Sequence, residues 1–101
     1  MIIRIFDTAI DPQEVDRARR LHREVIVPAF GRFAGCHGIE MGLSPEEHSR
    51  DLVLLVAISR WDSVAAIHQA TSSPEYDDAV SELRELFREN PIVRHFELTD
   101  G

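Results

Sequence analysis

The sequence predicts an α+β fold of the ferredoxin-like type, β-α-β-β-α-β, with one four-stranded antiparallel sheet. Four short segments rich in alternating or continuous apolar residues predict strands, near residues 2–9, 37–43, 52–58 and 92–99. Apolar residues at three- and four-residue spacing predict helical segments between the first two strands and between the last two. The chain has 101 residues, which fits a single domain over residues 1–101.

The first strand is followed at once by a helix start signal. Asp11 is a suitable N-cap, Pro12 occupies the first helical position and Glu14 the third. An apolar stripe follows and predicts one long amphipathic helix: Val15, Ala18, Leu21 or His22, Val25, Ala29 and Phe33. Pro28 lies inside this stripe, so we expect the helix to kink or end there.

The next two strands differ in their pattern. Residues 37–43 place His37, Ile39, Met41 and Leu43 on one face, and a turn over 44–47 leads onwards. Residues 52–58, LVLLVAI, are apolar on both faces, which is typical of a central strand. A chain this short can cover only one face of its sheet with its own helices. We therefore expect a second copy to cover the other face, as a homodimer.

The second helical region has a visible break. Asp62 or Ser63 caps its first half, Ser73-Pro74-Glu75 restarts it, and Asn90-Pro91 ends it before the last strand. Its second half carries one apolar stripe: Tyr76, Ala79, Val80, Leu83, Leu86 and Phe87.

Composition excludes several function classes. The formal net charge of −7 argues against nucleic acid and against anionic membrane surfaces. The longest apolar run, 52–58, is far shorter than the roughly 20 residues of a membrane helix. A single cysteine, Cys36, cannot form an internal disulfide, so we expect a cytoplasmic protein.

Three segments carry a family resemblance. They are PheAlaGlyCysHisGlyIleGlu at 33–40, Ser59-Arg60-Trp61-Asp62 at the end of the third strand, and SerSerProGluTyr at 72–76. In this order and spacing the chain resembles the antibiotic biosynthesis monooxygenase family of dimeric α+β barrels. The resemblance implies a homodimer with its two sheets face to face, and a pocket between each sheet and its own helices.

The resemblance also implies an activity. Enzymes of the family oxidise quinols, anthrones and similar phenolic rings with O₂ and without flavin or metal. A related branch binds and degrades haem, but the positions matching its haem-site residues fall near Ala70 and Val80, which cannot serve that purpose. We therefore expect a cofactor-independent monooxygenase acting on a small quinol, anthrone or other phenolic ring, with no cofactor.

Such chemistry needs a base and a dry pocket. The candidate bases are His22, His37 and His68, because imidazole titrates near neutral pH. The candidate pocket residues are Trp61, Phe30, Phe33, Met41 and Tyr76. The alternative is core packing for the aromatic residues, a hydrogen bond at the edge of the core for His22, and a solvent-facing side chain for His37. His48 and His95 are expected to be structural or solvated.

No metal signature accompanies these histidines, since the chain contains neither His-x-x-x-His nor His-x-His. Arg4 and Arg94, if they point into the dimer interior, are expected to pair with Glu40 or Glu97. The family's third strand usually carries an acidic or amide residue before the Trp, whereas residues 57–60 here are Ala, Ile, Ser and Arg. This difference favours the rival hypothesis, a non-catalytic dimeric barrel that binds a small apolar ligand or serves as an interaction module.

Overall fold

The computed structural model describes residues 1–46 and 51–99. The prediction made for His48 therefore falls outside the described residues. Its strands are β1 (Ile2–Ile10), β2 (Cys36–Leu43), β3 (Val53–Trp61) and β4 (Ile92–Glu97). They form one sheet in the order β2-β3-β1-β4, and every neighbouring pair is antiparallel. The predicted α+β, ferredoxin-like arrangement is confirmed.

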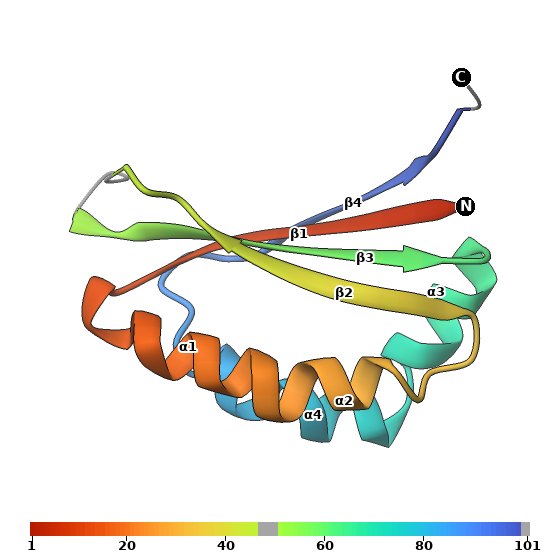
Figure 1. The fold of residues 1–101 in the computed structure, drawn as a ribbon, viewed down its shortest axis with the longest axis horizontal. Helices are drawn as coiled ribbons and strands as arrows, with labels where there is room; N and C mark the ends of the chain where they lie inside the picture. Colours follow the sequence, from red (N-terminus) through yellow and green to blue (C-terminus); the bar gives the residue numbers. More distant parts are fainter. Residues whose placement is uncertain (47–50, 100–101) are drawn as a thin grey trace.

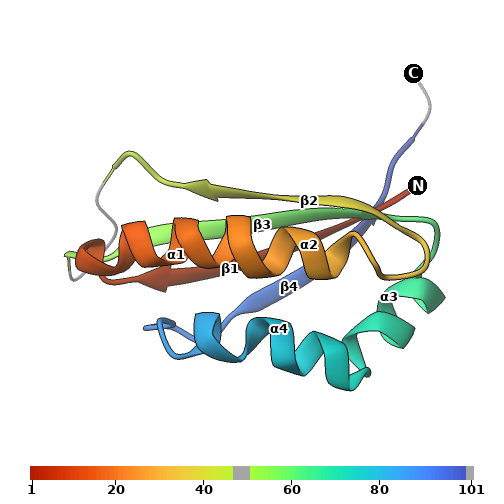
Figure 2. The same cartoon turned by 60° about the horizontal axis from the view of Figure 1, so that its bottom comes forward.

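The helices all lie on one side of this sheet (Figure 1). A 3-10 turn (Pro12–Glu14) leads into α1 (Val15–Leu21), a π-helical segment (His22–Ile26) and α2 (Val27–Phe30). The second region consists of α3 (Val64–Thr71) and α4 (Pro74–Arg84). Figure 2 shows α1 and α2 as one continuous rod, with α4 beside it over the same face of the sheet.

Helix starts occur where the sequence predicts them. The carboxylate of Asp11 accepts a hydrogen bond of 2.8 Å from the backbone N–H of Gln13. Ser63 caps α3 by accepting from Ala66 N–H, and Ser73 caps α4 by accepting from Tyr76 N–H. Each cap satisfies an N–H group that has no partner within the helix.

The helix does not end at Pro28, which corrects one of the two expected outcomes. Proline cannot donate to the carbonyl four residues earlier, and its ring collides with that carbonyl in a regular α-helix. Here the preceding segment widens to a π-helix, in which Val27 N–H donates to the carbonyl of His22. The extra residue shifts the buried stripe by one position, so that Ile26 is 2% exposed whereas Val25, expected to face the core, is 37% exposed.

A β-bulge near the start of β2 corrects the expected position of His37. Cys36 pairs with Trp61 and Ile39 with Ser59, so three steps along β2 match two along β3. Gly38 has a φ of +127°, a backbone conformation that side chains with a Cβ rarely adopt. Cys36 therefore shares the inner face with Ile39 and Met41, and His37 is exposed.

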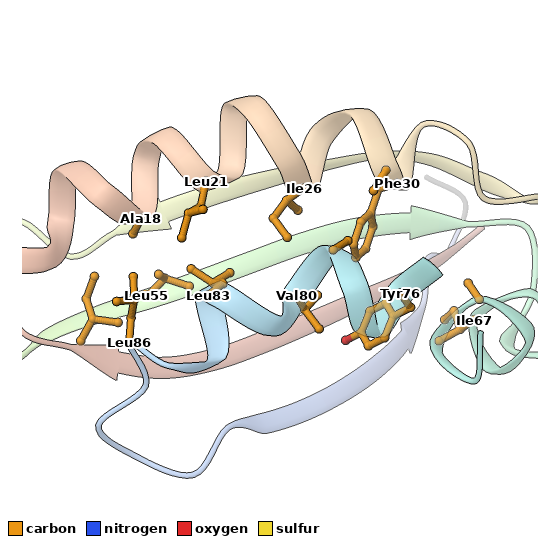
Figure 3. Packing of buried hydrophobic residues seen from close by; sticks show 14 of the residues in the cluster. Ala18, Leu21, Ile26, Phe30, Leu55, Ile67, Tyr76, Val80, Leu83 and Leu86 are labelled. Atoms are coloured by element: carbon orange, nitrogen blue, oxygen red, sulfur yellow. The ribbon is translucent and has the colours of Figure 1, made fainter. Parts of the chain in front are cut away.

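The core lies between the inner face of the sheet and the helices (Figure 3). Trp61 is 0% exposed, and its indole Nε1–H donates a 2.8 Å hydrogen bond to Oγ of Ser59, which is itself 1% exposed. Phe30 packs edge-on against Trp61 and Phe33 at ring-centroid distances of 6.1 and 5.2 Å. The aromatic end of the core thus joins α2 to the end of β3.

The outer face of the sheet carries apolar side chains that no helix covers. The strand register places these large apolar residues on this face: Ile3, Ile5, Leu54, Val56, Ile58, Ile92 and Phe96. Two ion pairs lie among them, Asp7 with Arg94 and Glu40 with Arg60, at 3.5 and 3.2 Å. Among the described residues, no helix has the length and apolar character needed to span a membrane.

Candidate functional site

A cavity of about 40 Å³ lies between the sheet and the helices. Its sheet side is formed by inward-facing residues of β1, β2 and β3: Arg4, Phe6, Ile39, Met41, Leu55 and Ala57. Its helix side is formed by residues of the π-helical segment, α2, α4 and the turn after α4: His22, Ile26, Phe30, Tyr76, Val80, Leu83, Arg84 and Phe87. Most of these side chains are apolar, and four of them carry polar groups.

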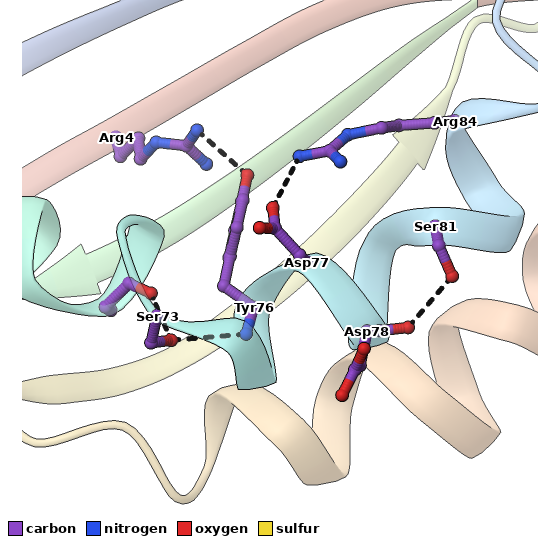
Figure 4. A network of polar contacts seen from close by, with 8 residues as sticks. Arg4, Ser73, Tyr76, Asp77, Asp78, Ser81 and Arg84 are labelled. Carbon is purple, nitrogen blue, oxygen red and sulfur yellow. Dashed lines mark hydrogen bonds and ion pairs between the residues drawn. The ribbon is translucent and has the colours of Figure 1, made fainter.

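Arg4 and Tyr76 form the buried polar contact of the cavity (Figure 4). Both side chains are more than nine-tenths buried, with 8% exposure each, and Arg4 Nη2 donates to the Tyr76 hydroxyl at 3.3 Å. The Arg4 guanidinium also lies 5.7 Å from the Phe6 ring centroid and 5.8 Å from that of Tyr76. Aromatic faces attract a cation, so these rings stabilise the buried charge in part.

Arg84 approaches the same tyrosine from α4. Its guanidinium lies 5.9 Å from the Tyr76 ring centroid, and its Nη2 contacts Oδ1 of Asp77 at 3.3 Å. The side chain of Arg84 is half exposed, so this residue forms the solvent side of the cavity whereas Arg4 forms its inner wall.

His22 is the one histidine among the described residues that line the cavity. It stands at the start of the π-helical segment, and π-helical turns occur frequently at functional sites. Partial burial lowers the pKa of His22 below its usual value. The ring is therefore neutral at pH 7, which is the form that accepts a proton.

The structure brings together only half of the predicted site residues. His22, Phe30, Met41 and Tyr76 line the cavity, as a shared pocket requires. The expectation that Trp61 and Phe33 line it as well is corrected. Trp61 is enclosed in the core, and Phe33 stacks on it at 6.4 Å, facing a separate hollow beside Ala29 and Ala70.

The other two candidate bases lie outside the cavity. His37 Nε2 lies 2.5 Å from the carboxylate of Asp62 at the exposed end of β2. His68 is exposed on α3, with its ring centroid 6.3 Å from that of His95 on β4. Within residues 1–46 and 51–99, no three His, Cys, Asp or Glu side chains are grouped closely enough to hold a metal ion.

Arg4 and Arg84 line the cavity although neither was predicted as a site residue. Arg4 lies on the inner face of β1, opposite Ser59 and His95, and not on the outer face of the sheet, where a dimer interior was expected. Alternation along the strand places Arg4 on the same face as Ile2 and Phe6, but it does not show whether that face or the opposite one is turned towards the helices. Arg94 does lie on the outer face, but its partner is Asp7, neither Glu40 nor Glu97.

Known structures share this fold over nearly the whole chain. A Bordetella bronchiseptica protein assigned to the antibiotic biosynthesis monooxygenases has a TM-score of 0.78 at 23% identity, covering 97% of this chain and 96% of that one. Rv0793 from Mycobacterium tuberculosis has a TM-score of 0.69 at 21% identity, covering 99% and 96%. A mutant of SnoaB, a cofactor-independent oxygenase from Streptomyces nogalater, has a TM-score of 0.72 at 16% identity, covering 99% and 95%.

Identities this low establish the fold alone. A search of curated proteins gives no significant match. The family model of the antibiotic biosynthesis monooxygenases, in contrast, matches residues 1–90, which include both sides of the cavity. The chain belongs to the antibiotic biosynthesis monooxygenase family.

Proposed function

We propose that this protein is a cofactor-independent monooxygenase that oxidises a small quinol, anthrone or other phenolic ring with O₂. The observation that carries the proposal is the meeting of a neutral histidine, His22, with Arg4 and Tyr76 in one apolar cavity. A group that removes a proton, groups that stabilise the resulting anion, and walls that exclude water are what this chemistry requires of a protein.

For an anthrone the reaction balances with O₂ as the sole oxidant. His22 removes a proton from the ring carbon, and the resulting anion transfers one electron to O₂. The two radicals combine to form a C–O bond, and the peroxide takes up a proton. Loss of water then leaves a carbonyl, so that a CH₂ group and O₂ become C=O and H₂O. The guanidinium of Arg4 and the Tyr76 hydroxyl stabilise the anionic oxygen of the ring.

The size of the cavity sets a condition on this proposal. A cavity that holds benzene measures about 150 Å³, whereas the present one measures about 40 Å³. A ring therefore enters only if side chains of the lining move. Met41, which is unbranched and flexible, and Arg84, which is half exposed, are the residues best able to do so.

Oxygen uptake by the purified protein, treated with a metal chelator, tests the proposal. We expect uptake above the spontaneous rate with an anthrone or a reduced naphthoquinone, and its loss in His22→Ala. His68→Ala is the matched control, since His68 is exposed on α3 outside the cavity, and it should keep the activity. Equal rates for the two variants would show that His22 is not the base.

The second candidate function is a non-catalytic barrel that binds a small apolar ligand or serves as an interaction module. The small cavity favours it, because a packed interior leaves little room for a reacting ring. No uptake over the whole panel of quinols and anthrones, together with saturable binding of a small aromatic probe, would favour this candidate over the monooxygenase.

We also propose a homodimer that buries the outer face of the sheet. Leu54, Ile92 and Phe96 are 39, 51 and 48% exposed there, and a contiguous apolar face is unfavourable in water. Light scattering should give twice the chain mass at micromolar concentration. Val56→Arg, which places a charge in the middle of this face, should give the monomer mass, and a wild-type monomer would refute the proposal.

A further inference from the structure

We infer that Arg4 favours substrates that carry a carboxylate, so that the cavity binds an aromatic carboxylate more tightly than a neutral ring of the same shape. This inference deepens the proposed function, since it names the substrate class of the same cavity. Arg4 is then a binding residue that determines specificity, and it is distinct from the base.

The guanidinium of Arg4 is a buried cation that is only partly paired. Arg4 is 8% exposed, yet no Asp or Glu among the described residues forms an ion pair with it. The remaining nine arginines of the described residues include six that lie on the surface in ion pairs with carboxylates, for example Arg60 with Glu40. Buried charges in proteins are ordinarily paired, so an arginine held by one tyrosine hydroxyl and two rings has bonding capacity left.

The N–H groups of Arg4 that do not bond Tyr76 remain accessible. Arg4 lines the cavity, and none of its buried nitrogen atoms lacks a hydrogen-bond partner. The Arg4 nitrogen atoms that do not bond Tyr76 are therefore not fully enclosed, and the cavity that Arg4 lines is where a ligand could reach them. A guanidinium presents paired N–H groups whose spacing matches the two oxygens of a carboxylate.

The side chains around Arg4 carry more positive than negative charge. The chain as a whole has a net charge of −7, but the described residues that line the cavity include two arginines and a histidine and no Asp or Glu. His95 lies opposite Arg4 on β4, with His68 beside it. The pKa of His95 is lowered, first by burial and then by the charges of Arg4 and His68. The two charge effects are those expected where positive charge is in excess. This excess favours an anion.

The apolar walls specify the rest of the ligand. Phe6, Phe30 and Phe87 line the cavity together with aliphatic side chains, and such walls suit an aromatic ring. An inorganic anion would leave these walls without a contact. The combination fits a ring with a carboxylate attached.

Calorimetric titration with 2-naphthoate and 2-naphthamide tests the inference. The two probes have nearly the same shape and differ in charge. We expect wild-type protein to bind 2-naphthoate about 10- to 100-fold more tightly, as a charged hydrogen-bonded pair implies. In Arg4→Gln the preference should fall below about twofold. Arg20→Gln removes the same charge from an exposed position on α1 and should keep the preference.

Each outcome decides the matter. Equal affinity of the two probes for wild-type protein, failure of both to bind, or a preference that survives Arg4→Gln would overturn the inference. If Arg4→Gln does not fold, Arg4→Lys replaces it and should keep only part of the preference, since an ammonium lacks the two-pronged geometry; an undiminished preference in that variant would count against Arg4.

Oxygen uptake separates this inference from the proposed function. The probes are 1,4-dihydroxynaphthalene and its 2-carboxylate. A binding preference for 2-naphthoate without oxygen uptake supports the carboxylate site and refutes the monooxygenase. Equal uptake with both quinols, together with equal binding of the naphthalene probes, refutes the carboxylate site and supports the monooxygenase.

Discussion

Replacing Ser59 with alanine should destabilise the protein far more than the loss of one hydroxyl group on its surface. Ser59 Oγ accepts the indole Nε1–H of Trp61 at 2.8 Å, and the two residues are 1% and 0% exposed. The removed hydroxyl leaves less space than the roughly 30 Å³ that a water molecule occupies in the liquid. No water can therefore replace the lost acceptor, and the indole N–H stays buried without a partner.

The size of the effect follows from that unsatisfied group. Leaving a buried donor without an acceptor costs about 1–3 kcal/mol. For a domain of about 100 residues, a loss of about 2 kcal/mol lowers the Tm by roughly 8 °C. Thermal unfolding followed by circular dichroism measures this, at one fixed protein concentration, because association also shifts the Tm.

Two further variants serve as controls for Ser59→Ala. Ser81→Ala removes an exposed hydroxyl that donates to the carbonyl of Asp78 at 3.1 Å, and it should change the unfolding free energy by less than about 0.5 kcal/mol. In a Trp61→Phe background the indole donor is absent, so adding Ser59→Ala should cost little. If Ser59→Ala is as mild as Ser81→Ala, or costs the same in both backgrounds, the reasoning about the indole donor is wrong.

Three other predictions test the caps, the titration and the backbone. Ser73→Ala removes the N-cap of α4 and should lower the unfolding free energy measured in urea by about 1 kcal/mol. Burial lowers the pKa of His22 in the folded state, so the unfolded chain binds that proton more tightly. Stability should therefore fall as the pH drops below about 6.5, and the fall in Tm from pH 7.5 to 5.5 should be smaller in His22→Gln. Gly35 has a φ of +81°, and an added Cβ would lie 2.8 Å from that of Ala66, so Gly35→Ala should cost at least about 1 kcal/mol in the same urea assay. Gly31→Ala, whose Cβ would meet nothing closer than 3.4 Å, is its control and should be nearly neutral.

Features that depend on neighbouring residues could be predicted from the sequence. The caps at Asp11 and Ser73 need only a side chain that reaches an N–H two or three residues ahead, and both form as expected. The central position of β3 in the sheet could be predicted because its residues are apolar on both faces. The element order followed from these local signals.

The contents of the site were harder to predict, because they depend on which face each strand turns towards the helices. Alternation along β1 separates Arg4 from Ile3 and Ile5, but it does not say which set lies inside. Trp61 and Phe33 have the composition expected of a ligand pocket, yet they pack against each other in the core. Nothing in the order of the residues distinguishes these two uses of an aromatic side chain.

Two backbone irregularities decide which residues reach the cavity. A regular α-helix would bring Val25 to the buried stripe, whereas the π-helical segment before Pro28 brings Ile26 there, with His22 on the same wall. A regular β2 would turn His37 inward beside Trp61, whereas the bulge at Gly38 turns it to the surface.

Each irregularity inserts one extra residue into its helix or strand. The residues before the insertion therefore face a different side from the one they would face in a regular element. Together they leave a single histidine at the cavity among the described residues, opposite a wall that contains Arg4. The other four histidines lie either outside the lining or outside the described residues, so the proposed mechanism assigns proton removal in this cavity to His22. Burial lowers the pKa of that ring, which keeps His22 in the neutral form that can act as a base.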